Sequence, residues 1–400
     1  MKEDEACPLF ETAARLLLPV IALGVALAGC GAGPAASAVA TIPGPGPGVG
    51  AGPGGGGESI SMSVSPVRAA LVVGQKISLT ATTNDQAGVT WSVSPPTAAI
   101  SPASSASQAV VAFTAPRTAG VYTVTATSVT DPARSKSASV AVTDLAGVYT
   151  YHDDLARDGA NEREYALTPA DVNASGFGKL FSCPVDGAIY AQPLWVPRLQ
   201  VDGKRRNVVF VATEPDSLYE FDADERPCVR LWKADLIGWH HGGDGGEASV
   251  PSGAGRHLVG KGDGDISPEV GITSTPVIDP TTGVLYVVSK SVIYSAGLHF
   301  YVRLHAIDLA TGAEKPGSPV TIHATFAGEE GVRASFDPRT ENQRAGLAFA
   351  NGTVYVSFGS HEDAMPFYGW ILGYRYDGSS FKHTYTLNIA PNAKEGGVWM

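Results

Sequence analysis

Short segments of alternating polarity recur along the second half of the chain. Three copies of an apolar segment, each followed by a second segment that ends in an acidic turn, lie at 208–212 with 217–224, 284–288 with 303–309, and 353–357 with 370–378. Alternation with a period of two is typical of β-strands, and recurrence of a strand pair indicates a repeated sheet. We therefore expect three four-stranded sheets, at 189–196, 208–213, 217–222 and 229–234, then 274–278, 284–289, 302–307 and 320–324, then 345–350, 353–357, 371–376 and 383–388. One further strand is expected at 178–187.

Residues 59–144 show the same alternation but no copy of the repeat. Six strands are expected there, at 60–65, 76–82, 89–93, 109–114, 121–128 and 135–142. Six or seven short strands in such a length predict a β-sandwich, with Trp91 between its sheets. The run at 120–126 resembles the late strand of bacterial Ig-like domains of the group-two type. This resemblance implies an Ig-like spacer or adhesion module.

The amino terminus reads as an export signal. An apolar run at 16–27 is too short to cross a bilayer, which needs about 20 residues, and is typical of a secretory signal peptide. It leads into Leu27-Ala28-Gly29-Cys30, which resembles a bacterial lipobox. The resemblance implies a lipoprotein signal peptide at 1–29 and lipidation of Cys30; a plain signal peptide with an incidental cysteine is the alternative. The acidic residues before Arg15 depart from the usual basic start, which leaves the true start of the protein open.

The segment 30–58 consists almost wholly of Gly, Pro and Ala, and predicts a flexible tether. Lys and Arg number 28 against 39 Asp and Glu, a net charge of −11. Nucleic-acid binding needs clustered positive charge, so no nucleic-acid partner is expected. The 47 glycines and 28 prolines favour an all-β, turn-rich chain. We expect an exported protein of the bacterial cell envelope, held to a membrane by its lipid anchor.

Residues 145–400 resemble the pyrroloquinoline-quinone-type (quinoprotein-like) β-propeller superfamily. The lead-in at 149–161 and the repeat at 304–315 carry the resemblance, and Trp232 stands where the family places a Trp that docks between neighbouring blades. The expected fold class is therefore all-β: an Ig-like β-sandwich followed by an incomplete β-propeller of about three blades plus an orphan outer strand. Propellers need about 4–8 blades. We expect truncation at the carboxy terminus, or closure of the ring by a second copy.

The resemblance implies one catalytic alternative, a quinone-dependent (PQQ) dehydrogenase-like oxidoreductase with calcium. The sequence has neither adjacent cysteines nor a segment resembling the catalytic Asp motif of such enzymes. We expect instead a noncatalytic binding or scaffold module, without catalytic residues, cofactor or metal, whose partner is an envelope protein or a glycan. A scaffold for envelope-protein assembly is a third possibility, based on fold analogy alone.

Four sets of residues carry side chains that could form a site. The run 239–247 collects His, Asp and Glu side chains, but its glycines favour a solvated loop. Glu269 is interpreted as satisfying turn amides, with contact to a ligand as the alternative. The triplet 361–363 is placed at a channel mouth, as an ordinary polar loop or, alternatively, as an acid–base pair. Cys183 and Cys228 could form a disulfide in an oxidising compartment, with two independent thiols as the alternative. The sequence does not fix the distance between them.

Overall fold

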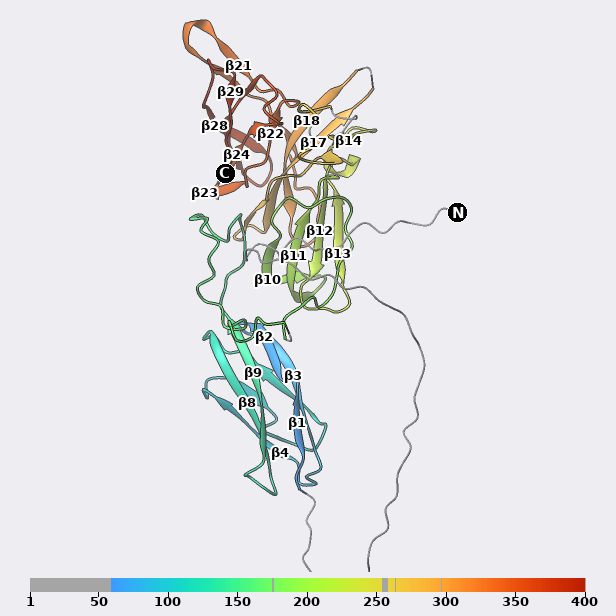
Figure 1. Cartoon of the computed structure of the whole chain (residues 1–400), viewed down its shortest axis with the longest axis vertical. Helices are drawn as coiled ribbons and strands as arrows, with labels where there is room; N and C mark the ends of the chain where they lie inside the picture. Colours follow the sequence, from blue (N-terminus) through green and yellow to red (C-terminus); the bar gives the residue numbers. More distant parts are fainter. Residues whose placement is uncertain (1–58, 175, 254–257, 263, 296, 400) are drawn as a thin grey trace, which may run out of the picture.

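The computed structural model describes residues 59–400 apart from 175, 254–257, 263, 296 and 400 (Figure 1). The expected signal peptide, Cys30 and the tether therefore lie outside the described residues. Strands make up the regular structure of the described part, joined by turns and by two short 3-10 helices, η2 (Trp239–His241) and η3 (Glu329–Gly331). The all-β prediction is confirmed. In the described ranges no helix combines the length and hydrophobicity that crossing a membrane requires.

Residues 59–144 form two sheets around one core. One sheet has the order β1 (Met62–Ser65), β3 (Lys76–Thr83), β7 (Val110–Thr114), β5 (Ala99–Ser101). The other has the order β2 (Arg68–Val72), β9 (Ser135–Thr143), β8 (Gly120–Ser128), β4 (Val89–Ser94), β6 (Ser104–Ser105). Alternate residues of both sheets, such as Leu79, Phe113 and Val140, are buried in the shared core, because successive side chains of a strand point to opposite faces.

Trp91 occupies this core, as expected. It is 6% exposed, and its indole N–H donates to Ser105 Oγ at 3.0 Å, which satisfies the one polar atom that it carries inward. Strand β2 was not expected from the sequence. It pairs in parallel with β9, so its partner lies far away along the chain.

Three larger sheets follow in residues 190–388. The first contains β10 (Leu194–Val201), β11 (Lys204–Ala212), β12 (Ser217–Asp222) and β13 (Arg230–Asp235). The second contains β14 (Ala248–Pro251), β15 (Glu269–Val270), β16 (Val277–Asp279), β17 (Val284–Ile293), β18 (His299–Asp308) and β19 (Val320–Thr321). The third contains β23 (Ala348–Ala350), β24 (Thr353–Ser357), β27 (Trp370–Tyr376) and β28 (Phe381–Asn388). The prediction of four strands in the second sheet was wrong, since β14 and β15 extend it to six.

Three short strand pairs lie between and beside these sheets. They are β20 (Thr325–Ala327) with β21 (Arg333–Ser335), β22 (Glu341–Asn342) with β25 (Gly359–Ser360), and β26 (Phe367–Tyr368) with β29 (Glu395–Gly396).

The second sheet lies between the other two and shares a core with each. On β17, Leu285 and Val287 pack against the first sheet, whereas Tyr286 and Val288 pack against the third. Both faces of β17 are therefore covered, and every residue of the strand is buried. Trp232 of β13 reaches across to the second sheet, where its indole N–H donates to the carbonyl of Leu309 at 3.1 Å.

The two outer faces of this array differ. Val211, Tyr219 and Phe221 on the outer face of the first sheet pack against residues 183–189. We call residues 183–189 the strap. On the third sheet, Tyr355 and Tyr385 meet on the outer face, and Tyr385 is 46% exposed.

The strand expected at 178–187 is absent. No residue of this segment belongs to a ladder, and side chains hold it instead. The amide N–H of Asp186 donates to the Tyr219 hydroxyl at 3.1 Å, and the carboxylate of Asp186 accepts from side chains of the first sheet. The expectation failed because Cys183 and Val185 of this segment pack on the outer face of the first sheet, so the segment covers that sheet instead of pairing with one of its strands.

The first strand of the first sheet is also displaced from its expected place at 189–196. Strand β10 runs on to Val201 and turns back directly into β11 through Asp202 and Gly203, both with positive φ. Asp-Gly is the preferred sequence for such a two-residue hairpin turn. The hairpin sets the register of β10 on β11, and its Asp-Gly pair is a local signal for the position of both strands.

The amino-terminal sheets lie next to the first of the larger sheets (Figure 1). Side-chain contacts join them. The amide of Gln75 donates to Asp224 at 2.9 Å and accepts from Asn207 at 3.2 Å. Arg68 forms a salt bridge with Asp171 of the connecting segment. These contacts are mostly exposed, so each contributes little to stability, but together they give the two parts a defined junction.

Candidate functional site

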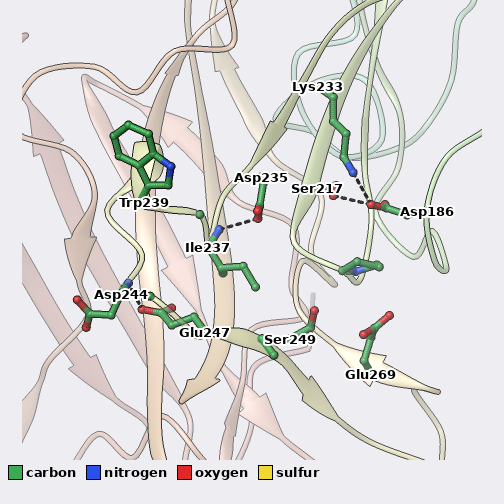
Figure 2. Close-up of a pocket in the computed structure, with 15 residues that line it drawn as sticks. Asp186, Ser217, Lys233, Asp235, Ile237, Trp239, Asp244, Glu247, Ser249 and Glu269 are labelled. Atoms are coloured by element: carbon green, nitrogen blue, oxygen red, sulfur yellow. Dashed lines mark hydrogen bonds and ion pairs between the residues drawn. The ribbon is translucent and has the colours of Figure 1, made fainter. Parts of the chain in front are cut away.

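A cleft of about 480 Å³ opens between the first sheet and the loop 236–249 that leads to the second (Figure 2). Its lining is rich in carboxylates and glycines. It comprises Asp186, Pro215, Ser217, Lys233, Asp235, Ile237, Gly238, Trp239, Asp244, Gly245, Gly246, Glu247, Ala248, Ser249 and Glu269. Strands β12 and β13, the strap, β14 and β15 all contribute, so the cleft exists only when the first two sheets are packed together.

One wall is fixed by a charged contact between the strap and the first sheet. Lys233 Nζ lies 2.8 Å from Asp186 Oδ2, and the hydroxyls of Ser217 and Thr213 donate to the same carboxylate at 2.7 Å. Burial by itself would raise the pKa of Asp186, but these bonds outweigh it, so the pKa is lowered and Asp186 is held as the anion. Figure 2 shows this contact with the dashed lines between Lys233, Ser217 and Asp186.

The opposite wall, the loop 236–249, is anchored by a buried ion pair. Arg303 of β18 donates to both carboxylate oxygens of Glu247, at 2.6 and 2.7 Å, and the Ser291 hydroxyl donates to Glu247 at 2.5 Å. The side chains of Arg303 and Glu247 are 5% and 0% exposed. Burial raises the pKa of Glu247, yet the bonds from Arg303 and Ser291 bring it below its ordinary value. The pair therefore stays ionised inside the protein.

A second anchor holds the same loop through histidine. His241 Nδ1 lies 2.9 Å and His305 Nδ1 lies 3.0 Å from Glu314 Oε2. Burial opposes the ionisation of Glu314, but the charge of His305 and hydrogen bonds from both histidines lower its pKa to about 2. The interpretation of 239–247 as a solvated loop was wrong for His241 and Glu247, because both side chains are buried against the second sheet.

The second anchor contains a serine, a histidine and a carboxylate in line. Ser289 Oγ lies 2.8 Å from His305 Nε2, and His305 Nδ1 lies 3.0 Å from the Glu314 carboxylate. Such spacing occurs in nucleophilic catalysis, which also needs an accessible hydroxyl. Ser289 is 1% exposed and His305 0% exposed, and neither lines the cleft. This group fixes the loop to the sheet.

Within the loop, the backbone at Gly243 lies very close to the backbone at Ile237. An added Cβ at Gly243 would lie 1.8 Å from the carbonyl oxygen of Ile237, so only glycine fits there. The turn it permits follows η2, whose first residue, Trp239, is 76% exposed. The ring of His240 lies beside it, with centroids 3.3 Å apart. A large aromatic side chain is thus held at the edge of the cleft by a loop whose base is buried.

Three carboxylates of the cleft lack a salt-bridge partner within the described part of the chain, namely Asp235, Asp244 and Glu269. Glu269 was expected to serve turn amides, but it lines the cleft instead, and burial followed by the charge of Asp186 raises its pKa. The cleft therefore carries more negative than positive charge, since Lys233 is its one lining cation and is already paired.

Two more carboxyl groups lie behind the cleft. Glu214 Oε2 accepts from the Gly271 amide at 2.8 Å, and Asp216 Oδ1 accepts from the Lys290 amide at 3.1 Å. The second oxygen of each has no hydrogen-bond partner among the residues described. Burial is the main cause of two raised pKa values. The pKa of Glu214 is raised to about 7, and the pKa of Asp216 is raised well above its ordinary value. Gly271 passes between them, where a Cβ would lie 2.5 Å from Asp216 Oδ2.

The remaining candidate residues lie apart from the cleft. His361 is buried and approaches Lys290 Nζ at 2.6 Å, and burial followed by the charge of that lysine lowers its pKa, so it does not line an open channel mouth. Cys183 and Cys228 are joined in a disulfide with Cα atoms 5.4 Å apart, on the covered outer face of the first sheet. Across the described residues, no three His, Cys, Asp or Glu side chains gather closely enough to hold a metal ion.

Comparison with known proteins assigns no family to this chain. The sequence matches no protein-family model. A search of the curated proteins finds no relative either.

Proposed function

We propose that this chain is an exported lipoprotein of the bacterial cell envelope whose carboxy-terminal part is a noncatalytic binding module, with the cleft beside Trp239 as its binding site. The exposure of Trp239 carries the proposal. Burying an aromatic side chain is among the largest favourable terms available to a protein, and Trp is enriched among the residues that dominate binding energy. Here 76% of it is left in solvent by a loop that is otherwise firmly attached.

The attachment of that loop supports binding in a second way. The Glu247–Arg303 and His241–Glu314 contacts fix the base of the loop on the second sheet, and Lys233–Asp186 fixes the strap opposite. A site that is already ordered loses little conformational entropy when a ligand enters. Such rigid walls are typical of binding clefts, which are usually preformed.

The proposal also covers the fold of the two parts of the chain, 59–144 and 145–400. Two sheets around the core of Trp91 support an Ig-like spacer at 59–144. Three sheets stacked face to face, with Trp232 docked on the neighbouring sheet, support an incomplete β-propeller at 145–400. Lipidation at Cys30 and the tether at 30–58 would hold this assembly off a membrane surface, and the Cys183–Cys228 disulfide suits an oxidising compartment.

Two experiments test the proposal. Metabolic labelling with a fatty-acid analogue should label the native protein and leave Cys30→Ser unlabelled; equal labelling would refute the lipid anchor. The purified protein, immobilised, should retain a component of an envelope extract, protein or glycan, which Trp239→Ala fails to retain. Equal retention by Trp399→Ala, an aromatic change outside the cleft, provides the matched control. Stoichiometric uptake of pyrroloquinoline quinone with calcium, followed by dye reduction with alcohols or sugars, would replace this proposal by the oxidoreductase alternative.

A further inference from the structure

The charges of the cleft point to the chemistry of its ligand. Two of its five acidic side chains are paired with a cation of the protein itself, Asp186 with Lys233 at the surface and Glu247 with Arg303 in the interior. Asp235, Asp244 and Glu269 have no such partner among the salt bridges of the described residues. Like charges gathered in one cleft repel each other, and an entering cation relieves that repulsion, whereas an entering anion increases it.

Trp239 narrows the class of cation. The face of an indole ring attracts an ammonium or guanidinium group placed within about 6 Å of its centroid. Figure 2 shows Trp239 and Asp244 on one side of the cleft and Asp186 and Glu269 on the other. A cation carried on an apolar stem can place its head near the carboxylates while the stem lies along the ring, as lysine and arginine side chains do.

The size of the cleft is consistent with such a ligand. Its volume of about 480 Å³ is in the range of small-molecule sites, about 300–1,000 Å³, and it is open along one side. An extended peptide can therefore lie across it and insert one or two side chains. The net charge of −11 on the whole chain would also steer a basic partner toward the protein.

From these observations we propose that the cleft recognises a lysine or arginine side chain of an extended basic segment in a protein partner, held between Trp239 and the unpaired carboxylates. This inference rests on the proposed function, because it names the ligand of the same site. Of the two partners proposed above, an envelope protein and a glycan, the charge of the cleft favours the protein.

The buried acids behind the cleft predict that binding depends on pH. Glu214 faces the Gly271 amide, the Thr273 hydroxyl and the charge of Glu269, while Asp216 faces the Lys290 amide and the charges of Glu214, Asp235 and Glu269. A cation nearby favours the ionised form of a carboxyl group. Since the pKa of Glu214 is raised to about 7, the ligand should bind more tightly at pH 8 than at pH 6, with release of protons.

The test uses the full-length protein in detergent and a fluorescent, end-blocked pentapeptide in which glycine alternates with arginine. The matched peptide carries citrulline, which has the shape of arginine without its charge, and a third carries glutamate. Fluorescence anisotropy should show binding of the arginine peptide that weakens with salt, and at least about tenfold weaker binding of the citrulline peptide. Trp239→Ala should weaken arginine-peptide binding about 3- to 30-fold.

Variants separate the cleft from the rest of the surface. Asp235→Asn with Glu269→Gln should weaken binding of the arginine peptide and reduce its salt dependence. Glu225→Gln, an exposed acid away from the cleft, and Trp399→Ala should leave binding unchanged. Matching circular dichroism and unfolding midpoints establish that the variants are folded.

Three results would overturn the inference: equal binding of the arginine and citrulline peptides, binding that Trp239→Ala leaves intact, or saturable binding of CaCl₂ that abolishes peptide binding at constant ionic strength. If the peptides fail while Trp239-dependent retention of an envelope component succeeds, the ligand class is wrong and the binding module stands. If both fail, the proposed function fails as well.

Discussion

Replacing Glu247 by Gln tests whether the loop beside the cleft is held by a buried charge. The substitution keeps the shape of the side chain but removes the charge that Arg303 requires. Arg303 would then remain beside β17 with 5% of its side chain exposed and no anion to compensate it. Glu247→Gln should therefore destabilise the native state strongly. The destabilised region should include the loop that carries Trp239 and forms one wall of the cleft.

The structure sets the expected magnitude. Exposed ion pairs contribute about 0–1 kcal/mol, whereas removing one partner of a buried pair costs about 3–5 kcal/mol. The two bonds of 2.6 and 2.7 Å between buried groups place Glu247–Arg303 in the second class. With a denaturant slope of about 3 kcal/mol/M, the urea midpoint should fall by about 1–2 M.

Urea unfolding followed by circular dichroism at pH 7 provides the measurement. Because the pKa of Glu247 is lowered in the folded state, its stabilisation is present above the unfolded pKa and is lost as the pH falls through the folded pKa. The difference between native and Glu247→Gln should thus shrink in acid. Glu247→Leu combined with Arg303→Leu should be more stable than either single change. A loss below about 1 kcal/mol at pH 7 would show that the pair is solvated and that the reasoning fails.

Three further changes should have measurable effects. Cys183→Ser with Cys228→Ser opens a loop with a sequence separation of 45 and should lower the free energy of unfolding by about 4 kcal/mol, as reductant should on the native protein; unequal losses would point to a role beyond the crosslink. Glu220 is buried, and neither of its carboxyl oxygens has a hydrogen-bond partner among the described residues. Burial, followed by the charge of Asp202, raises its pKa to about 8. The stability of the native protein should therefore fall as the pH rises from about 5 to 8. Glu220→Gln should therefore gain about 3–4 kcal/mol on the native protein over that range, and a pH-independent difference would contradict this. Gly271→Ala places a Cβ 2.0 Å from the Glu214 carbonyl oxygen and should cost at least about 1–3 kcal/mol in a thermal-unfolding assay; an unchanged midpoint would show that the backbone there yields easily.

The sequence predicted the strands best where local alternation decides the structure. The expected strands at 217–222 and 353–357 coincide with β12 and β24, because period-two patterning is a property of neighbouring residues. The strand predicted at 178–187 is absent because packing on a distant part of the chain, and not local alternation, decides the structure of this segment. Its apolar residues cover another sheet, and no local pattern distinguishes a covering segment from a strand.

The cleft depends on contacts between residues far apart in the sequence. Glu247 meets Arg303 across 56 positions, and His241 meets Glu314 across 73. Spacing along the chain carries no signal for such pairs, and the glycines of the loop by themselves indicate only a solvated turn. The Asp202-Gly203 turn, by contrast, is a local signal that would have placed β10 correctly.

The unequal outer faces give the stacked array a direction. At the first sheet, the disulfide-bonded strap occupies the position that a neighbouring layer would need. At the third, Tyr355 and Tyr385 present an aromatic surface to solvent. The strap therefore leaves no room for a further β-layer on the first sheet, whereas β24 and β28 of the third sheet leave aromatic side chains that such a layer would cover.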